Sequence, residues 1–327
     1  MKIIYLIKKY IYIYILFLFL FFLLIFDLFF LKYTYSHSFF IKPNQTLEKI
    51  TNNLYKEAVI DNKFFFKSLI KLIFAEKKLK AGEYNFANNN IFQIIIKIKE
   101  GKSVKRKIII PEGLTSLEII EILEKTDGVI INDYNSINLI EEGTLFPSTY
   151  FYAYGTNSNI IINNMKKEMD KILNSAWKNR DKNLKLKNHK EVLVLASLIE
   201  KETSLDNEKS MIAQVFLNRL KLNMKLQSDP TVIYGIEKKL GVQIKELKKQ
   251  DLKFESKFNT YLNYGIPEGP ICNPGKESIV AVTNPSKGDL LYFVANGSGG
   301  HNFSSNYNDH LKNIKKLREI NKEHYEK

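Results

Sequence analysis

The stretch Glu191–Thr203, which reads EVLVLASLIEKET, decides the fold of the C-terminal part of the chain. From residue 192 to residue 199 it is apolar apart from Ser197, so it predicts a largely buried helix. Glu200 shares the face of Ser197, whereas Glu202 lies roughly 200° around the helix and is expected to point to solvent. One carboxyl, that of Glu200, is thus expected against the core-facing stripe, where desolvation favours the protonated form that a general acid needs. An ordinary charged helix surface is the alternative that this stretch leaves open.

Polar turns follow this predicted helix. The helical apolar period returns in residues 211–222, and the turn after it, residues 226–235, reads LQSDPTVIYG. Its amide, hydroxyl and carboxyl side chains suit the hydrogen bonding of a polyhydroxylated ligand. Residues 258–270, FNTYLNYGIPEGP, and residues 273–275, NPG, add Gly/Pro turns with amides and aromatic rings. We expect these turns to shape a groove; ordinary surface turns are the alternative.

Residues 10–31 form an apolar run whose only charge is Asp27. A helix of that length reaches roughly 33 Å, enough for a hydrocarbon core of about 30 Å, so the run predicts one transmembrane anchor. Lysines in residues 1–9 predict that this end is cytoplasmic and that the rest of the chain lies outside. No small-residue cleavage site follows, which argues against a cleaved signal peptide. The expected localisation is the cell membrane, single-pass, with the residues after the anchor extracytoplasmic.

Residues 38–150 contain an internal repeat. Ile41 and Ile110 begin the same pattern, in which an apolar strand end runs into a polar turn and a short amphipathic helix. In the second copy, Thr115 and Glu118 have the spacing of a capping box, which predicts a helix start there. We expect two small α+β modules; chance similarity in a sequence of low diversity is the alternative.

The rest of the chain is expected to form two further parts. Residues 151–190 are a connecting segment that ends in a basic stretch, Lys178–Lys190, with few apolar residues. Residues 191–327 form the predicted catalytic domain.

Composition excludes several functions. The chain has 327 residues and a formal charge of +14, yet only four of its 49 basic residues are Arg. Proteins that bind the phosphates of nucleic acids favour Arg for bidentate contacts, so this composition argues against nucleic acid as a partner. A single cysteine, Cys272, excludes a disulfide framework and a CxxC redox motif. His301 and His310 form no HExxH motif, and the glycine-rich residues 297–300 lack the Lys-Ser/Thr of a phosphate-binding loop. We therefore expect no metal and no cofactor.

Ordered motifs from about residue 40 to the end carry a family resemblance. They are residues 111–113 (PEG), 142–150 (EGTLFPSTY), 195–203 (LASLIEKET), 215–220 (VFLNRL), 226–235 (LQSDPTVIYG), 258–261 (FNTY), 265–270 (GIPEGP), 273–275 (NPG), 292–296 (YFVAN) and 299–303 (GGHNF). Together they resemble the MltG (YceG-like) endolytic murein transglycosylases. The family's pattern differs at Ser148, where Asp is usual, and at Ser228, where Thr is common.

The resemblance implies a fold and an activity. It implies an α+β chain with an N-terminal single transmembrane helix, a LysM-like region and a C-terminal catalytic domain outside the cytoplasm. The family's catalytic glutamate falls on Glu200. That residue is expected to protonate the bond between MurNAc and GlcNAc and then to act as base on the MurNAc C6 hydroxyl, which gives a 1,6-anhydro end and terminates nascent strands.

The residues and the resemblance together give the expected partners and leave two alternatives open. The expected partners are peptidoglycan glycan strands, the lipid bilayer through the anchor, and peptidoglycan synthases. The expected groove contacts are Gln227, Asp229, Thr231, Asn259, Tyr261, Asn273 and His301. One alternative is a lysozyme-like muramidase that uses Glu200 and Asp229, because glycoside hydrolases usually employ two carboxyls. Another is a non-catalytic, membrane-tethered protein that only binds peptidoglycan.

Overall fold

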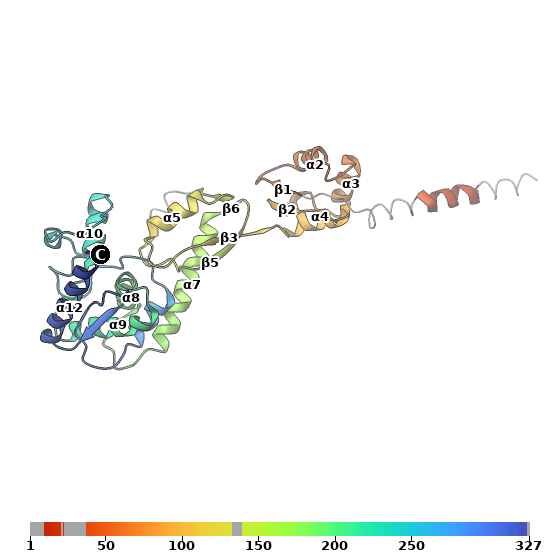
Figure 1. Cartoon of the computed structure of the whole chain (residues 1–327). Helices are drawn as coiled ribbons and strands as arrows, with labels where there is room; N and C mark the ends of the chain where they lie inside the picture. The colour runs from red at the N-terminus through yellow and green to blue at the C-terminus, as the bar shows by residue number, and fades with distance from the viewer. Residues whose placement is uncertain (1–9, 21, 23–36, 133–138, 326–327) are drawn as a thin grey trace, which may run out of the picture. The chain divides into compact units, whose positions relative to one another are not determined.

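The computed structural model describes residues 10–20, 22, 37–132 and 139–325. Their contacts divide the chain into two compact units. The N-terminal unit comprises residues up to 107, 127–130 and 151–157, and the C-terminal unit comprises residues 108–126, 131–150 and 158 onward. Short helices and two-stranded sheets build both units, which confirms the predicted α+β class (Figure 1).

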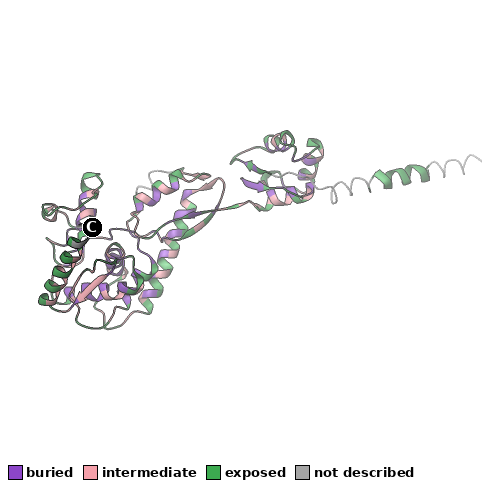
Figure 2. Cartoon of the chain, viewed as in Figure 1, coloured by how far each residue is buried: buried purple, intermediate pink, exposed green. Residues whose placement is uncertain are grey.

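The predicted membrane localisation is contradicted. Residues 10–20 are helical and their side chains are exposed (Figure 2). At about 1.5 Å per residue, a helix of that length covers roughly half of a hydrocarbon core about 30 Å thick. Within the described ranges, no helix combines the length and the apolar character needed to cross a bilayer. The predicted tail, residues 1–9, and residues 21 and 23–31 of the predicted anchor lie outside the described residues.

The N-terminal unit contains a small antiparallel sheet. β1 (Ser38–Ile41) pairs with β2 (Gly82–Asn85), and Phe39 lies opposite Tyr84. Between β1 and β2 the chain forms α2 (Leu47–Lys56), α3 (Lys63–Leu72) and a 3₁₀ turn (Glu76–Lys78). After β2 it forms α4 (Ile91–Glu100). Apolar side chains from strands and helices alike form the core, including Phe39, Ile41, Leu54, Phe66, Ile70, Tyr84, Ile94 and Ile98. Each such side chain contributes about 1.5–3 kcal/mol on burial, which holds these short elements together.

The predicted helix start at Thr115 is confirmed. α5 (Ser116–Lys125) begins with a capping box, in which Thr115 accepts from the backbone of Glu118 and the Glu118 carboxyl accepts from the backbone of Thr115. Two more two-stranded sheets lie between residues 105 and 157. In one, β3 (Lys105–Ile109) pairs with β5 (Thr149–Ala153). In the other, β4 (Val129–Ile130) runs parallel to β6 (Thr156–Asn157).

The C-terminal unit is built around α8 (His189–Glu202), which confirms the predicted buried helix. Asn188 caps its start, and every residue from Val192 to Ile199 is buried. Four helices pack against it: α7 (Ser158–Lys178), α9 (Asp206–Lys221), α10 (Asp229–Leu240) and α11 (Lys276–Thr283). The unit is completed by a 3₁₀ turn (Asp251–Lys253), the antiparallel pair β7 (Tyr292–Ala295) and β8 (His301–Ser304), and α12 (Tyr307–Tyr325). Because α8 is covered on several sides, polar groups at its C-terminal end are enclosed by protein.

Candidate active site

The carboxyl of Glu200 is engaged on both oxygens. Glu200 lies in the last turn of α8, and its side chain is only 6% exposed. Oε2 accepts hydrogen bonds from the backbone amide of Gly275 at 2.8 Å and from the hydroxyl of Ser278 at 2.7 Å. Oε1 lies 3.4 Å from Nζ of Lys209. Glu200 therefore joins the end of α8 to the start of α11 and to α9.

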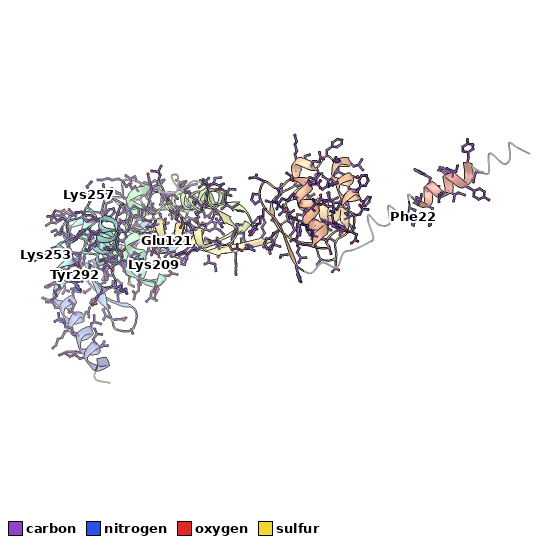
Figure 3. The ribbon with its side chains drawn as sticks, turned by 90° about the horizontal axis from the view of Figure 1, so that it is seen from above. Phe22, Glu121, Lys209, Lys253, Lys257 and Tyr292 are labelled. Atoms are coloured by element: carbon purple, nitrogen blue, oxygen red, sulfur yellow. The ribbon has the colours of Figure 1, made fainter. Side chains whose placement is uncertain are left out.

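Lys209, labelled in Figure 3, is a buried cation with three carboxylate partners. Its side chain is 2% exposed, and Nζ lies 2.9 Å from Asp206, 3.4 Å from Glu200 and 3.8 Å from Glu112. Although burial acts to lower it, these carboxylates raise the pKa of Lys209. Burial, followed by the charge of Glu200, raises the pKa of Glu112. A charge this well enclosed is stabilised only while its partners remain, so the network fixes Glu200 in place.

Glu202 is predicted to point to solvent, and this prediction is wrong. Part of the residue keeps exposed surface, but its carboxyl is desolvated, and burial raises the pKa of Glu202 to about 7. Oε1 accepts a hydrogen bond of 2.5 Å from the hydroxyl of Ser228, the residue before α10. The physical reason is that α8 packs against α9, α10 and α11 together, so the side opposite the core stripe is covered as well.

Charged groups from other elements act on Glu202. The negative charge of Asp229, the first residue of α10, raises the pKa of Glu202 beyond the effect of burial, and the positive charges of His301 and Arg219 lower it. Tyr261 donates a hydrogen bond of 2.5 Å from its hydroxyl to Oδ1 of Asp229. Three predicted groove residues (Asp229, Tyr261 and His301) therefore belong to the surroundings of Glu202.

His301 is held by the carboxylate of Glu208. Oε1 of Glu208 accepts from the backbone amide of His301 at 2.9 Å, and Oε2 lies 2.7 Å from its Nδ1. Thr203, which directly follows Glu202, donates from its hydroxyl to the same Oε2 at 3.5 Å. Although burial acts to raise it, the contacts from His301 lower the pKa of Glu208. Glu208 is therefore an ionised anchor for the imidazole near neutral pH.

Three predicted groove residues, Thr231, Asn259 and Asn273, are fully buried. Thr231 donates to the carbonyl of Ser228, and Asn259 donates to two carbonyls of the loop before it. Asn273 donates to Leu114, Ser116 and Glu142, and accepts from the amide of Leu145. Because these polar atoms are satisfied inside the protein, the three side chains organise loops around the site.

Gln227 lies at the surface of the same turn. It is exposed, and its φ of 49° is a left-handed conformation that non-glycine residues seldom adopt. The backbone N–H of Gln227 donates to the carbonyl of Thr260. The strained backbone is thus held between the turn and the loop that carries Tyr261.

Among the described residues, no group of three or more His, Cys, Asp or Glu side chains is placed to hold a metal ion. Cys272 is buried, donates to the carbonyl of Ser197, and has a pKa that burial raises well above its usual range. Its thiol is therefore in its neutral form near pH 7.

The sequence interpretation missed Glu202, Glu208 and Lys209. Glu208 and Lys209 lie in the first turn of α9, which carries charges of both signs. Such a pattern is typical of a helix start that is exposed to solvent. One signal was present: glycine precedes His301, and a side chain at Gly300 would place its Cβ 2.6 Å from Oε1 of Glu208. A glycine beside a polar residue can indicate such a close approach.

Comparisons with known proteins show the family to which the chain belongs. A family model described as YceG-like matches residues 39–316, so the chain belongs to the YceG-like family. A crystal structure of a YceG-like protein from Listeria monocytogenes is 31% identical, with a TM-score of 0.52 over 85% of this chain and 99% of that one.

Two relatives carry the name endolytic murein transglycosylase. The protein of Bacillus subtilis (strain 168) is 34% identical over 223 residues, which are 67% of this chain and 60% of the relative. The protein of Streptococcus pneumoniae serotype 2 is 36% identical over 177 residues, which are 53% of this chain and 31% of the relative. The matches thus span less than two thirds of the length of both relatives.

Proposed function

We propose that this chain is a peptidoglycan lytic transglycosylase, which cleaves the bond between MurNAc and GlcNAc within glycan strands and leaves 1,6-anhydro-MurNAc ends. The observation that carries the proposal is the carboxyl of Glu202, whose pKa burial raises to about 7. A group with that pKa is in part protonated near neutral pH, so it can donate a proton to a glycosidic oxygen. Membership of the YceG-like family and the names of the two relatives support the same activity.

In this proposal the general acid is Glu202 rather than Glu200. Both oxygens of Glu200 are already engaged within the protein, by the Gly275 amide, the Ser278 hydroxyl and the Lys209 ammonium. Glu202 has one hydroxyl donor, Ser228, and the adjacent negative charge of Asp229 favours its protonated form. Glu200 then has a structural role, because its contacts connect α8 to α9 and to the start of α11.

The expected reaction uses no water. Glu202 gives its proton to the O4 of GlcNAc as the bond from C1 of MurNAc breaks, and the C6 hydroxyl of the same MurNAc closes onto C1 and gives up its proton to a base. An intramolecular nucleophile gains roughly 7–11 kcal/mol from its proximity, so no second carboxylate is needed to hold a water. Hydrolytic glycosidases use a second carboxylate for that purpose. Asp229 is the carboxylate that would serve a hydrolase here.

The N-terminal unit is proposed to be the LysM-like module that binds glycan. Two helices lie along the chain between the paired strands β1 and β2, and this compact α+β arrangement supports the proposal. Peptidoglycan synthases are the proposed protein partners, since strands that the enzyme shortens are the products of synthases.

The test is digestion of purified sacculi by the full chain, followed by mass spectrometry of the released muropeptides. The variants are Glu202→Gln and Glu200→Gln. Glu121→Gln is the control, because Glu121 is exposed and, among the described residues, pairs only with Lys125 on its own helix. We expect anhydro ends from the wild type and the control, and a loss of about 10²–10⁴-fold in Glu202→Gln.

Other outcomes overturn parts of the proposal. Loss of activity in Glu200→Gln with full activity in Glu202→Gln would restore Glu200 as the acid. Reducing ends would mean a muramidase. Unchanged sacculus binding without any release, under conditions where a control enzyme is active, would mean a binding protein and would contradict both enzymatic functions.

A further inference from the structure

His301 has a defined ring orientation. The carboxylate of Glu208 contacts both its backbone amide and its Nδ1, at 2.9 and 2.7 Å. The side chains of His301 and Glu208 are 15% and 9% exposed, so water does little to weaken this pair. The ring also packs edge-on against Phe293, with centroids 5.4 Å apart. These contacts fix the position of the imidazole.

The loop before His301 is shaped for this pair. At Gly300 a Cβ would lie 2.6 Å from Oε1 of Glu208 and 3.2 Å from Nδ2 of Asn296. Asn296 accepts from the amides of Ser298 and Gly300 and so closes the loop on itself. The glycine therefore allows the carboxylate to approach the backbone closely, a function that a simple surface turn would not need.

Pairing with Glu208 also sets the tautomer. Although burial acts to raise it, the contacts from His301 lower the pKa of Glu208, so its carboxylate is an acceptor. In the uncharged form of the ring, Nδ1 then carries the hydrogen and Nε2 presents its lone pair. Within the part of the chain that the structure describes, Nε2 forms no hydrogen bond. The same carboxylate–imidazole arrangement makes histidine a base in hydrolytic triads.

His301 acts on the proposed acid. Its positive charge lowers the pKa of Glu202, so the two side chains interact electrostatically across α8 and β8. The other groups that face Glu202 are Ser228 and Asp229 from the start of α10 and Arg219 from α9. Arg219 donates to the carbonyl of Leu291 from Nε and to the carbonyl of Leu226 from Nη1. His301 therefore contributes an imidazole to this cluster, beside one carboxyl that can carry a proton.

We propose that His301 is the general base for ring closure, separate from the acid Glu202. This inference rests on the proposed lytic transglycosylase function. As Glu202 protonates O4 of GlcNAc and the bond from C1 breaks, O6 of MurNAc forms its bond to C1 and passes its proton to Nε2 of His301. The imidazolium then returns this proton to the Glu202 carboxylate. One carboxyl acting twice, as acid and then as base, is the competing mechanism.

An aryl substrate separates the two mechanisms. A glycan oligomer that ends in a nitrophenyl glycoside of MurNAc has a leaving group that needs no proton, so only the base is required. We expect Glu202→Gln to lose far less activity on this substrate than on sacculi, and His301→Gln to lose about 10²-fold or more on both. Added imidazole should restore part of the activity of His301→Ala. His189→Gln is the control histidine variant, and circular dichroism checks folding.

A second variant tests the orientation of the ring. Glu208→Gln presents an amide to Nδ1, which reverses the tautomer and removes the Nε2 lone pair, so kcat should fall while KM and the unfolding temperature change little. Full activity of His301→Gln on both substrates, with Glu202→Gln inactive on both, would overturn this inference and support one carboxyl acting twice. A wild type that releases no anhydro ends would instead overturn the proposed function itself.

Discussion

Ser228 donates a hydrogen bond of 2.5 Å to Oε1 of Glu202, and this contact joins the start of α10 to the end of α8. The bond stabilises the ionised carboxyl, so it opposes the effects of burial and of Asp229 on the pKa of Glu202. The proton affinity of the proposed acid therefore results from opposed contacts, each of which a single substitution can remove.

Ser228→Ala should make the enzyme more active at alkaline pH. Loss of the hydrogen bond raises the pKa of Glu202 further, so the acid keeps its proton to higher pH. A hydrogen bond of about 0.5–1.5 kcal/mol corresponds to a gain of roughly two- to 13-fold on the alkaline limb of the profile. The measurement is muropeptide release between pH 6 and 9. An alkaline limb that moves to lower pH would contradict this origin of the pKa.

Glu202→Gln should stabilise the protein at pH 8. The folded-state pKa of about 7 is above the ordinary value of 4.5, so the folded protein binds more protons than the unfolded chain between these values. Stability is then lost as pH rises from about 4.5 to 7, by roughly 3 kcal/mol in total. Thermal unfolding should show a higher midpoint for the variant at pH 8 and little difference near pH 4. Equal midpoints at pH 8 would mean that the carboxyl is solvated.

Lys209→Met should destabilise the fold strongly. The substitution leaves the carboxylate of Glu200 enclosed without its cation, and breaking a buried pair costs about 3–5 kcal/mol. The double variant with Glu200→Gln should recover part of this loss, since the unpaired charge is gone. Urea unfolding at pH 7 measures both effects. Lys125→Met, at an exposed pair on α5, is the control and should change stability by less than about 1 kcal/mol.

Gly300→Ala and Gly275→Ala should differ in their effect on activity. At both positions a Cβ meets a carboxylate: that of Glu208 at 2.6 Å for Gly300 and that of Glu112 at 1.9 Å for Gly275. The Glu112 side chain is 48% exposed and can move aside, whereas Glu208 is held on both oxygens by His301. We expect a loss of about 10-fold or more for Gly300→Ala, by displacement of the proposed base, and a smaller one for Gly275→Ala. Initial rates of muropeptide release check this order.

Local patterns predicted the helices well. The apolar run from residue 192 to 199 forms the buried part of α8, and the spacing of Thr115 and Glu118 forms the predicted capping box. Both depend on residues within a few positions of one another, which a single sequence displays directly. The motifs also indicated the correct family.

Long-range contacts could not be predicted in the same way. The interpretation of Glu202 assumed that α8 has one buried side, but three helices near its end enclose the other side too. Asn273 and Tyr261 look alike as polar loop residues, yet one donates to Glu142 inside the protein and the other to Asp229 beside the site. Their partners are more than 30 positions away, so nothing in the local sequence separates a structural amide from a site residue.

Glu200 and Glu202 are two positions apart on one helix, and their opposite surroundings depend on the rotation of that helix about its axis. The packing of Val192–Ile199 fixes this rotation. A core substitution that rotated α8 slightly about its axis would move the carboxyl of Glu200 away from Lys209 and the carboxyl of Glu202 away from Ser228. The side chains that select which glutamate can hold a proton are thus aliphatic, and they lie up to ten residues from the chemistry. Repacking of this core is therefore a route by which the pH optimum could change while every polar residue of the site stays the same.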